Sequence, residues 1–391
     1  MRVTLPVDPS NKINNEVATI IFVHQNTDIP VPQIFAFDDS RENELGFEWI
    51  LMEMLPGATL RTRWRKLSRD AKRDLVEQIA KYQAQLFCQQ FPAIGNIFVN
   101  PGTQLMTKDS PHSTVAADTK QVQEENQQLL PTLGQLVSMI WGDYITQDVP
   151  RGPFTNAEDW IRARLTLVLT EQERIIKTSD DEDDIEEAED AKEIAERLLK
   201  LLPSIFPSNT NTPELSILFH DDLSMQNILC DDDGKITGII DWECVSALPL
   251  WRACELPEFL TGRDRDEEPQ RDQYAPDNSE EDTFGLARDV FDNEGVNSLY
   301  WEHLLEYELT ILRDLFVKEM GNIAPRWIEE LEKGEVKADF ELAVQKCNNN
   351  WRTKKVKSWL DALEKGKICS AKRQLRPVDL AAATLGSGFI Q

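Results

Sequence analysis

The sequence has few basic residues for its length, and this shortage limits the partners that it can bind. Against 69 aspartates and glutamates stand only 42 lysines and arginines, so the formal charge of the 391-residue chain is −27 at pH 7. A chain with this balance repels nucleic acid and anionic membrane surfaces. We therefore expect neither as a partner, and a cationic small molecule fits the charge better.

Long apolar runs are also missing. No stretch reaches the roughly 20 consecutive apolar residues that a helix needs to cross a bilayer. The first ten residues, MRVTLPVDPS, have neither the apolar core of a secretory signal peptide nor the arginine-rich, acid-poor character of a transit peptide. We expect a soluble protein in the cytoplasm.

The sequence also lacks motifs of paired cysteines. The six cysteines show no CxxC motif and no regular spacing. Such a distribution indicates neither a zinc site nor a disulfide framework. We expect these cysteines to be reduced and mostly structural.

What is present is enough apolar sequence for a large core. The chain is 41% hydrophobic, and a single core seldom grows beyond roughly 250 to 300 residues. We therefore predict two lobes in an α+β fold. Residues 1–57 form a small lobe with strands, residues 58–365 form a mostly helical lobe, and residues 366–391 form a tail without a strong signal.

The first lobe mixes strands with one helix. Residues 2–7 are typical of a strand that ends near Pro6, and residues 14–27 repeat apolar side chains at helical spacing. That pattern predicts one face containing Val17, Ile20, Ile21 and His24. Residues 33–39 and 47–55 predict two further strands.

In the second lobe the periodicity becomes helical from Ser68 onward. Thr155 and Glu158 match a capping box, in which each side chain satisfies a free N–H at the start of a helix. The stretch DDEDDIEEAED, residues 180 to 190, holds nine acids in eleven positions. We expect it to be a solvated or disordered insertion spanning residues 178–192.

The stretch FHDDLSMQNILCDDDGKITGIIDWE, residues 219–243, carries the chemistry. Its apolar segments NILC and KITGIID predict two strands, and the segment DDDG between them predicts a turn with Asp233 and Gly234 at its tip. The stretch is therefore predicted to be a β-hairpin.

The register of this hairpin brings polar side chains to its open end. With the turn at its predicted place, the numbers of cross-strand partners sum to about 467, so Asn227 lies close to Ile240 and Asp241. Cross-strand neighbours are about 4.5 to 5.5 Å apart. Asp222 lies on the loop that leads into the same end. Two oxygen-bearing side chains in this arrangement suit Mg²⁺, which takes few protein oxygens together with water and phosphate oxygens.

The segments HDDLSMQN and IIDWE together resemble the catalytic loop and the metal-binding aspartate of the aminoglycoside phosphotransferase family. The first fits H-x-D-x-x-x-x-N, and the aspartate of the second follows fourteen residues after Asn227. The resemblance extends from Arg2 to about residue 260. It implies a bilobal protein-kinase-like fold with a shortened first lobe, and an ATP- and Mg²⁺-dependent kinase related to choline and fructosamine kinases.

The resemblance assigns roles to the acids of the hairpin. Asp222 matches the catalytic aspartate, which orients the acceptor hydroxyl and takes its proton. Asn227 and Asp241 match the ligands of the metal ion that neutralises the nucleotide phosphates. We predict that His220 braces the loop by hydrogen bonding, and that Asp221 is a supporting acid.

In the first lobe the resemblance implies a nucleotide site. Arg2 occupies the position of the phosphate-contacting base, where kinases usually have lysine, and Glu16 matches the helix glutamate that pairs with it. Alternatively, Arg2 is a solvent-exposed strand end. Backbone groups near Glu53 and Met54 match the segment between the lobes that hydrogen bonds the adenine.

One departure from the family concerns the start of the chain. The family has two strands and a phosphate-covering turn before the strand that contains Arg2, and this sequence begins too late to include them. We expect either a truncated reading frame or a protein that lacks half of its nucleotide lid. Both weaken phosphate alignment.

Three functions compete at this point. The first is a kinase that phosphorylates a hydroxyl of a small molecule, for which a cationic amino alcohol or amino sugar fits the overall charge. The second is a kinase-like binding protein with impaired catalysis. The third, a metal-dependent phosphohydrolase, lacks the further histidine or acid cluster that such enzymes use.

Overall fold

The computed structural model describes most of the chain, and we restrict structural statements to that part. The described residues are 1–4, 8–99, 132–137, 148–207, 212–276, 293–349 and 351–366. Most of the predicted tail, from residue 367 onward, lies outside them. Among the described helices, none combines the length and apolar character that crossing a bilayer requires.

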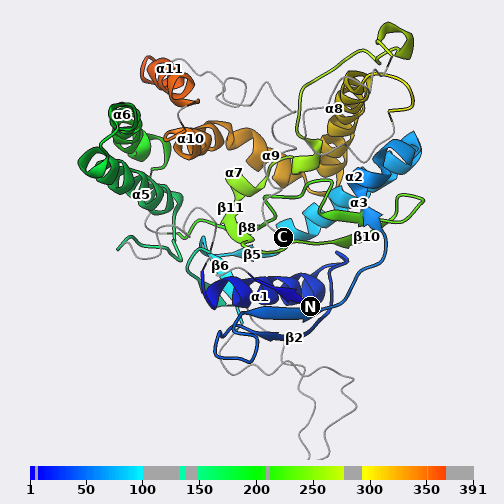
Figure 1. The fold of residues 1–391 in the computed structure, drawn as a ribbon, viewed down its shortest axis with the longest axis horizontal. Helices are drawn as coiled ribbons and strands as arrows, with labels where there is room; N and C mark the ends of the chain where they lie inside the picture. The colour runs from blue at the N-terminus through cyan, green and yellow to red at the C-terminus, as the bar shows by residue number, and fades with distance from the viewer. Residues whose placement is uncertain are drawn as a thin grey trace, which may run out of the picture.

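A small antiparallel sheet with one helix forms the start of the fold. Its order is β1 (Arg2–Val3), β3 (Trp49–Met52) and β2 (Ile34–Asp38). Helix α1 (Asn11–Asn26) lies across it (Figure 1). The predicted strands and helix are confirmed in type where they are described, with one correction; the predicted end of the first strand near Pro6 lies outside the described residues. His24 is exposed and does not join the buried face of α1, although the preceding Phe22 and Val23 in the same turn are buried.

The hairpin of residues 219–243 has the predicted register at its open end, and a bulge between Ile236 and Gly238 shifts the register near the turn. Strand β9 (Ile228–Cys230) pairs with β10 (Ile236–Ile239) so that Ile239 lies opposite Ile228, and the Ile240 N–H donates to the Asn227 carbonyl at 3.0 Å. Strand β4 (Ala58–Thr59) adds to the other edge of β9. Gly57 precedes β4 with φ of 106°, and a Cβ there would lie 2.7 Å from the Cys230 carbonyl oxygen. Only glycine therefore fits this approach.

Two further strand groups support the loop before the hairpin. Strand β8 (Ser216–Phe219) pairs with β11 (Ser246–Pro249) and with β5 (Gln90–Phe91). Strand β6 (Asn96–Phe98) pairs with β7 (Thr132–Gly134). Because β8 ends at Phe219, it fixes the point where the catalytic loop begins.

The helices make up most of the remaining described chain (Figure 1). Ser68 caps α3 (Arg69–Cys88) by accepting a hydrogen bond from the Ala71 N–H, and the helix begins where the sequence periodicity predicts. The helices are α2 (Leu60–Arg63), η1 (Trp64–Lys66), α3 (Arg69–Cys88), α5 (Ala157–Thr178), α6 (Glu182–Ile205), α7 (Leu250–Ala253), η2 (Glu258–Leu260), η3 (Arg271–Gln273), α8 (Ser298–Ile323), α9 (Pro325–Lys333), α10 (Glu335–Lys346) and α11 (Thr353–Glu364).

One local prediction in this region is wrong, and the prediction for the acidic segment holds only in its exposure to solvent. Asn156, not Thr155, caps α5, because the Asn156 side chain accepts from the Asp159 N–H at 2.8 Å. The acidic segment is not disordered where it is described. Asp181 caps α6, and the acids that follow form the first turns of this helix. Acids in a first turn favour a helix through its dipole, and packing of α6 against α5 supplies the remaining stability.

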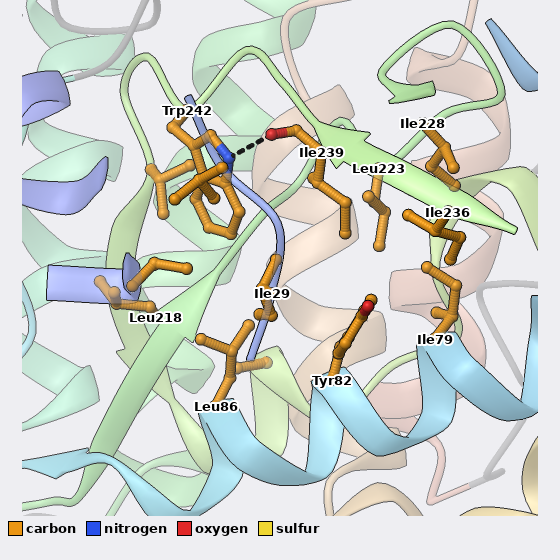
Figure 2. Close-up of a cluster of buried hydrophobic side chains, with 14 of the residues drawn as sticks. Ile29, Ile79, Tyr82, Leu86, Leu218, Leu223, Ile228, Ile236, Ile239 and Trp242 are labelled. Atoms are coloured by element: carbon orange, nitrogen blue, oxygen red, sulfur yellow. Dashed lines mark hydrogen bonds between the residues drawn. The ribbon is translucent and has the colours of Figure 1, made fainter. Parts of the chain in front are cut away.

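The core beneath the hairpin fixes its position. Side chains of α3, including Ile79, Tyr82 and Leu86, pack against apolar side chains of the hairpin and of the loop before it (Figure 2). Trp242 is fully buried there, and its indole N–H donates to the Ile239 carbonyl at 2.9 Å. The chain that follows β10 is thus anchored on both sides of Asp241.

Candidate active site

Asp222 lies on the loop between β8 and β9, where solvent reaches it. The side-chain amide of Asn227 donates to the Asp222 carbonyl at 2.8 Å and to its carboxylate Oδ2 at 2.9 Å. Asn227 itself is buried. Because both bonds use the Asn227 Nδ2 atom, they orient the carboxylate without using the Asn227 amide oxygen. The structure thus brings together two of the predicted residues.

His220 lies under the loop. It is 4% exposed, its Nε2 lies 3.0 Å from the Ile240 carbonyl, and its ring packs edge-on against Trp242 with the ring centroids 4.9 Å apart. An N–H on Nε2 donates to that carbonyl. These contacts tie the start of the catalytic loop to the residue before Asp241, which is the position that a bracing histidine requires.

Asp241 follows β10 with φ of 64°, in the left-handed region, where aspartate is better tolerated than most residues. Its carboxylate Oδ1 is 3.7 Å from Arg2 Nη1. Partial burial, and next the charge of Glu243, raise the pKa of Asp241 above its ordinary value, while Arg2 opposes this shift. Arg2 therefore compensates the charge of Asp241 only in part.

Arg2 is the centre of a charge cluster rather than an exposed strand end. It forms an ion pair with Glu16, and its Nη2 is 3.5 Å from a Glu243 oxygen. Lys12 Nζ lies 3.0 Å from the same glutamate. Burial raises the pKa of Glu16 to about 7, although Arg2 lowers it. The cluster joins β1, α1 and the chain after β10.

Glu53 and Met54 follow β3 and are exposed, with Met54 94% exposed. The Glu53 N–H already donates to the Gln33 carbonyl at 2.8 Å, and a Glu53 carboxylate oxygen accepts from the Gln33 N–H at 3.2 Å. Because the Glu53 N–H already has a partner, the predicted backbone contacts with adenine are limited to the Glu53 carbonyl and the Met54 N–H.

Sequence reasoning missed Glu258. Its carboxyl hydrogen bonds with Asp222, and partial desolvation together with that bond and the Asp222 charge raise the pKa of Glu258 to about 7. The Phe259 N–H donates to the Leu223 carbonyl at 3.0 Å, which fastens η2 to the catalytic loop. The only signal in the sequence is an acid after Pro257, which is too common to identify a site.

The donor set fits a hard divalent cation. The Asn227 amide oxygen and the Asp241 carboxylate are the kind of oxygen ligands that Mg²⁺ takes, and Asp222 lies beside them. Asn227 and Asp241 would hold such an ion.

A carboxylate oriented by an amide on the loop before a hairpin, with a second carboxylate directly after it, is typical of kinase-like phosphotransferases. A family model described as the phosphotransferase enzyme family matches residues 1–275. The chain belongs to this family, and the family predicted from the two sequence segments is confirmed.

Relatives in fungi are similar over the same part of the chain. A subtelomeric hrmA-associated cluster protein of Aspergillus fumigatus is 26% identical over 269 residues, which are 63% of this chain and 52% of that protein. Altered inheritance of mitochondria protein 9, mitochondrial, of Clavispora lusitaniae is 25% identical over 271 residues, 64% of this chain and 44% of that protein. The chain therefore matches only about half the length of these relatives.

Proposed function

We propose that the protein is an ATP-dependent phosphotransferase that adds the γ-phosphate of ATP to a hydroxyl of a small molecule. The observation that carries the proposal is the Asp222 carboxylate, held by Asn227 at 2.9 Å at the hairpin end from which Asp241 also emerges. In this proposal the fold is bilobal, and the nucleotide lies between the sheet β1-β3-β2 and the catalytic loop.

The residues have separate tasks in this reaction. Asp222 accepts the proton of the acceptor hydroxyl as its oxygen bonds to the γ-phosphorus, and the bond from that phosphorus to the bridging oxygen breaks so that ADP leaves with the electron pair. Asn227 and Asp241 would hold Mg²⁺, which would neutralise phosphate charge. Arg2 contacts the phosphates and Glu16 pairs with Arg2, while the Glu53 carbonyl and the Met54 N–H position the adenine.

A kinase-like binding protein with impaired catalysis is the second candidate. The observation in its favour is the position of Arg2, whose guanidinium lies 3.7 Å from Asp241 Oδ1. A fixed cation beside a predicted metal ligand competes with Mg²⁺ for that carboxylate.

Asp222→Ala distinguishes the two candidates. General-base catalysis contributes typically about 10² to 10⁴ in rate, so we expect ADP release with a working acceptor to fall by that factor. ATP binding and thermal stability should stay nearly unchanged, because Asp222 is exposed. The control is Asp233→Ala, an exposed acid at the hairpin tip. Equal turnover in both variants would remove Asp222 from the mechanism.

The place where the protein works is also a proposal. We propose that the protein works in the cytoplasm, whereas relatives such as that of Clavispora lusitaniae carry "mitochondrial" in their names. Cell fractionation with an antibody against the native protein decides between the two compartments.

A further inference from the structure

The guanidinium group of Arg2 lies among three carboxylates, and its two terminal nitrogen atoms face different ones. Nη2 forms the ion pair with Glu16 and lies 3.5 Å from a Glu243 oxygen. Nη1 is the nitrogen closest to Asp241, at 3.7 Å from Oδ1. Among the described residues, no other basic side chain lies within ion-pair distance of Asp241. Arg2 is therefore the resident cation at the predicted metal ligand.

The contacts of Nη2 are anchored more firmly than the contact of Nη1. The Glu16 side chain is 2% exposed, whereas the Asp241 side chain is 39% exposed. Glu243 is itself held by the buried Lys12, whose Nζ lies 3.0 Å away. Because water weakens exposed ion pairs, the long contact with Asp241 contributes least of the three. Arg2 can thus give up Asp241 while it keeps Glu16 and Glu243.

In its present position the guanidinium disfavours a metal ion on Asp241. A divalent cation held by Asp241 and Asn227 has the same sign of charge as Arg2 and shares a carboxylate with it. Like charges a few Å apart repel strongly where the surroundings are partly buried. Without a further anion, a metal ion and Arg2 therefore compete for the Asp241 carboxylate.

A nucleotide changes this balance, because its phosphates offer Arg2 another anion. Guanidinium groups bind phosphate oxygens well, and the Arg2 side chain is partly exposed, so a ligand reaches it. A phosphate that draws Nη1 away frees Asp241, and its oxygens are also the ligands that Mg²⁺ prefers besides carboxylates and water. The phosphate removes the competing cation and adds metal ligands in one step.

We propose, on the basis of the proposed kinase function, that Arg2 keeps divalent cations away from Asp241 until a nucleotide binds. The protein then takes up Mg²⁺ only together with ATP. Arg2 exchanges Asp241 for a phosphate oxygen at Nη1, while Glu16 and Glu243 hold Nη2. The contact that favours an impaired protein becomes, in this proposal, a control on the order of binding.

The first test measures Mn²⁺ binding to the full chain without nucleotide, from the electron paramagnetic resonance signal of free Mn²⁺. Because a chain with a charge of −27 also attracts Mn²⁺ elsewhere on its surface, each protein is compared with the same protein carrying Asp241→Asn. We expect wild type and Asp241→Asn to bind Mn²⁺ equally. A Mn²⁺ site that depends on Asp241 in the nucleotide-free wild type would overturn the proposal.

Removal of the guanidinium should open the site. Without nucleotide, Arg2→Met should gain a Mn²⁺ site at least about 10-fold tighter than wild type offers, and the added Asp241→Asn substitution should abolish it. Arg41→Met is the control, since Arg41 pairs with Glu48 at 3.8 Å. No gain in Arg2→Met would contradict the proposal. If that variant does not fold, Arg2→Gln, which keeps a donor for Glu16, replaces it.

The analogue AMP-PNP, which is not hydrolysed, separates this inference from the proposed function. With AMP-PNP and Mn²⁺ in the calorimeter, Asp241→Asn should weaken binding at least about 10-fold relative to wild type. Binding independent of Asp241 would show that Arg2 keeps this carboxylate, which overturns the inference and favours the impaired binding protein. No binding of AMP-PNP at all would reject the kinase together with the inference, whereas an Asp241-dependent site without nucleotide rejects the inference alone.

Discussion

At the scale of single residues, the site is a set of carboxylates whose environments differ. Asp222 is exposed and oriented by Asn227, while Asp241 is partly covered and faces Arg2. Glu258 is bonded to Asp222 and has a pKa of about 7. Carboxylates in such different environments can take different roles in one reaction.

Asp241→Asn should weaken Mg²⁺-dependent ATP binding at least about 10-fold, since changes around a metal site typically cost 10- to 100-fold in affinity. Metal-free ATP binding should change less, because the lost charge acts through the ion. Calorimetric titrations with and without Mg²⁺ measure both, with Asp233→Asn as the control. Equal losses with and without the metal would contradict the assignment of Asp241.

Glu258→Gln should remove an inflection near pH 7 from the pH dependence of kcat. Below that pH, Glu258 is protonated and neutral, whereas above it the ionised Glu258 adds a negative charge that attracts the proton leaving the acceptor hydroxyl. The wild-type rate should therefore rise through pH 7, and the variant should stay at the low-pH rate. A retained inflection would assign it to another group.

The same substitution has a consequence for stability. Because the pKa of Glu258 is higher in the folded than in the unfolded chain, the folded state binds more protons between about pH 4.5 and 7. The free energy of unfolding should fall as pH rises through that range and become flat above it. Urea titrations should show a weaker fall in Glu258→Gln.

At the scale of elements, the acidic segment is the clearest case of helix formation favoured by capping. The Asp181 carboxylate accepts from the Asp183 N–H at 2.9 Å, and three acids stand in the first turn of α6. The helix then packs along α5. The charge run that indicates disorder in isolation is thus the favourable start of a helix whose later turns are apolar on one side.

Asp181→Ala should lower the free energy of unfolding by about 1 kcal/mol, the typical cost of losing a cap. Asp180→Ala, one residue earlier and without the capping bond, serves as the control. Urea unfolding measures the difference, and hydrogen exchange at the first turn of α6 should increase in the first variant only. ADP release should be unchanged in both.

At the scale of the whole molecule, a buried charge network holds the helical part together. Glu341 of α10 binds Arg164 of α5 and Arg252 of α7. Burial alone would raise the pKa of Glu341, but the two arginines outweigh it and hold that pKa below its ordinary value. Three elements that are distant in sequence therefore depend on one carboxylate.

Glu341→Gln should destabilise the fold by about 3 to 5 kcal/mol, since it leaves buried arginines without a counter-charge. Because the folded pKa is lowered, the contribution of Glu341 is present above its unfolded pKa and lost as pH falls through the folded value. The difference between wild type and variant in urea titrations should thus shrink in acid. Glu332→Gln, on the exposed side of α9, is the control, and an equal loss in both variants would contradict the network's role.

The sequence by itself determined the catalytic hairpin. A shift of one residue would turn every side chain of β9 to the opposite face, so the apolar pattern and the Asp233-Gly234 turn leave one register. Local propensity and residue spacing encode three features: this register, the family motif and the start of α3 after Ser68. Each of them depends only on residues that are close together in the chain. Their outcome in the structure agrees with the prediction.

Only the tertiary structure decided which distant side chains meet. The bond between Glu258 and Asp222 and the sharing of Glu341 by two arginines arise from the packing of η2 on the catalytic loop and of α10 against α5 and α7. No sequence periodicity predicts such pairs, because a charged residue has the same local structural preference with or without a distant partner.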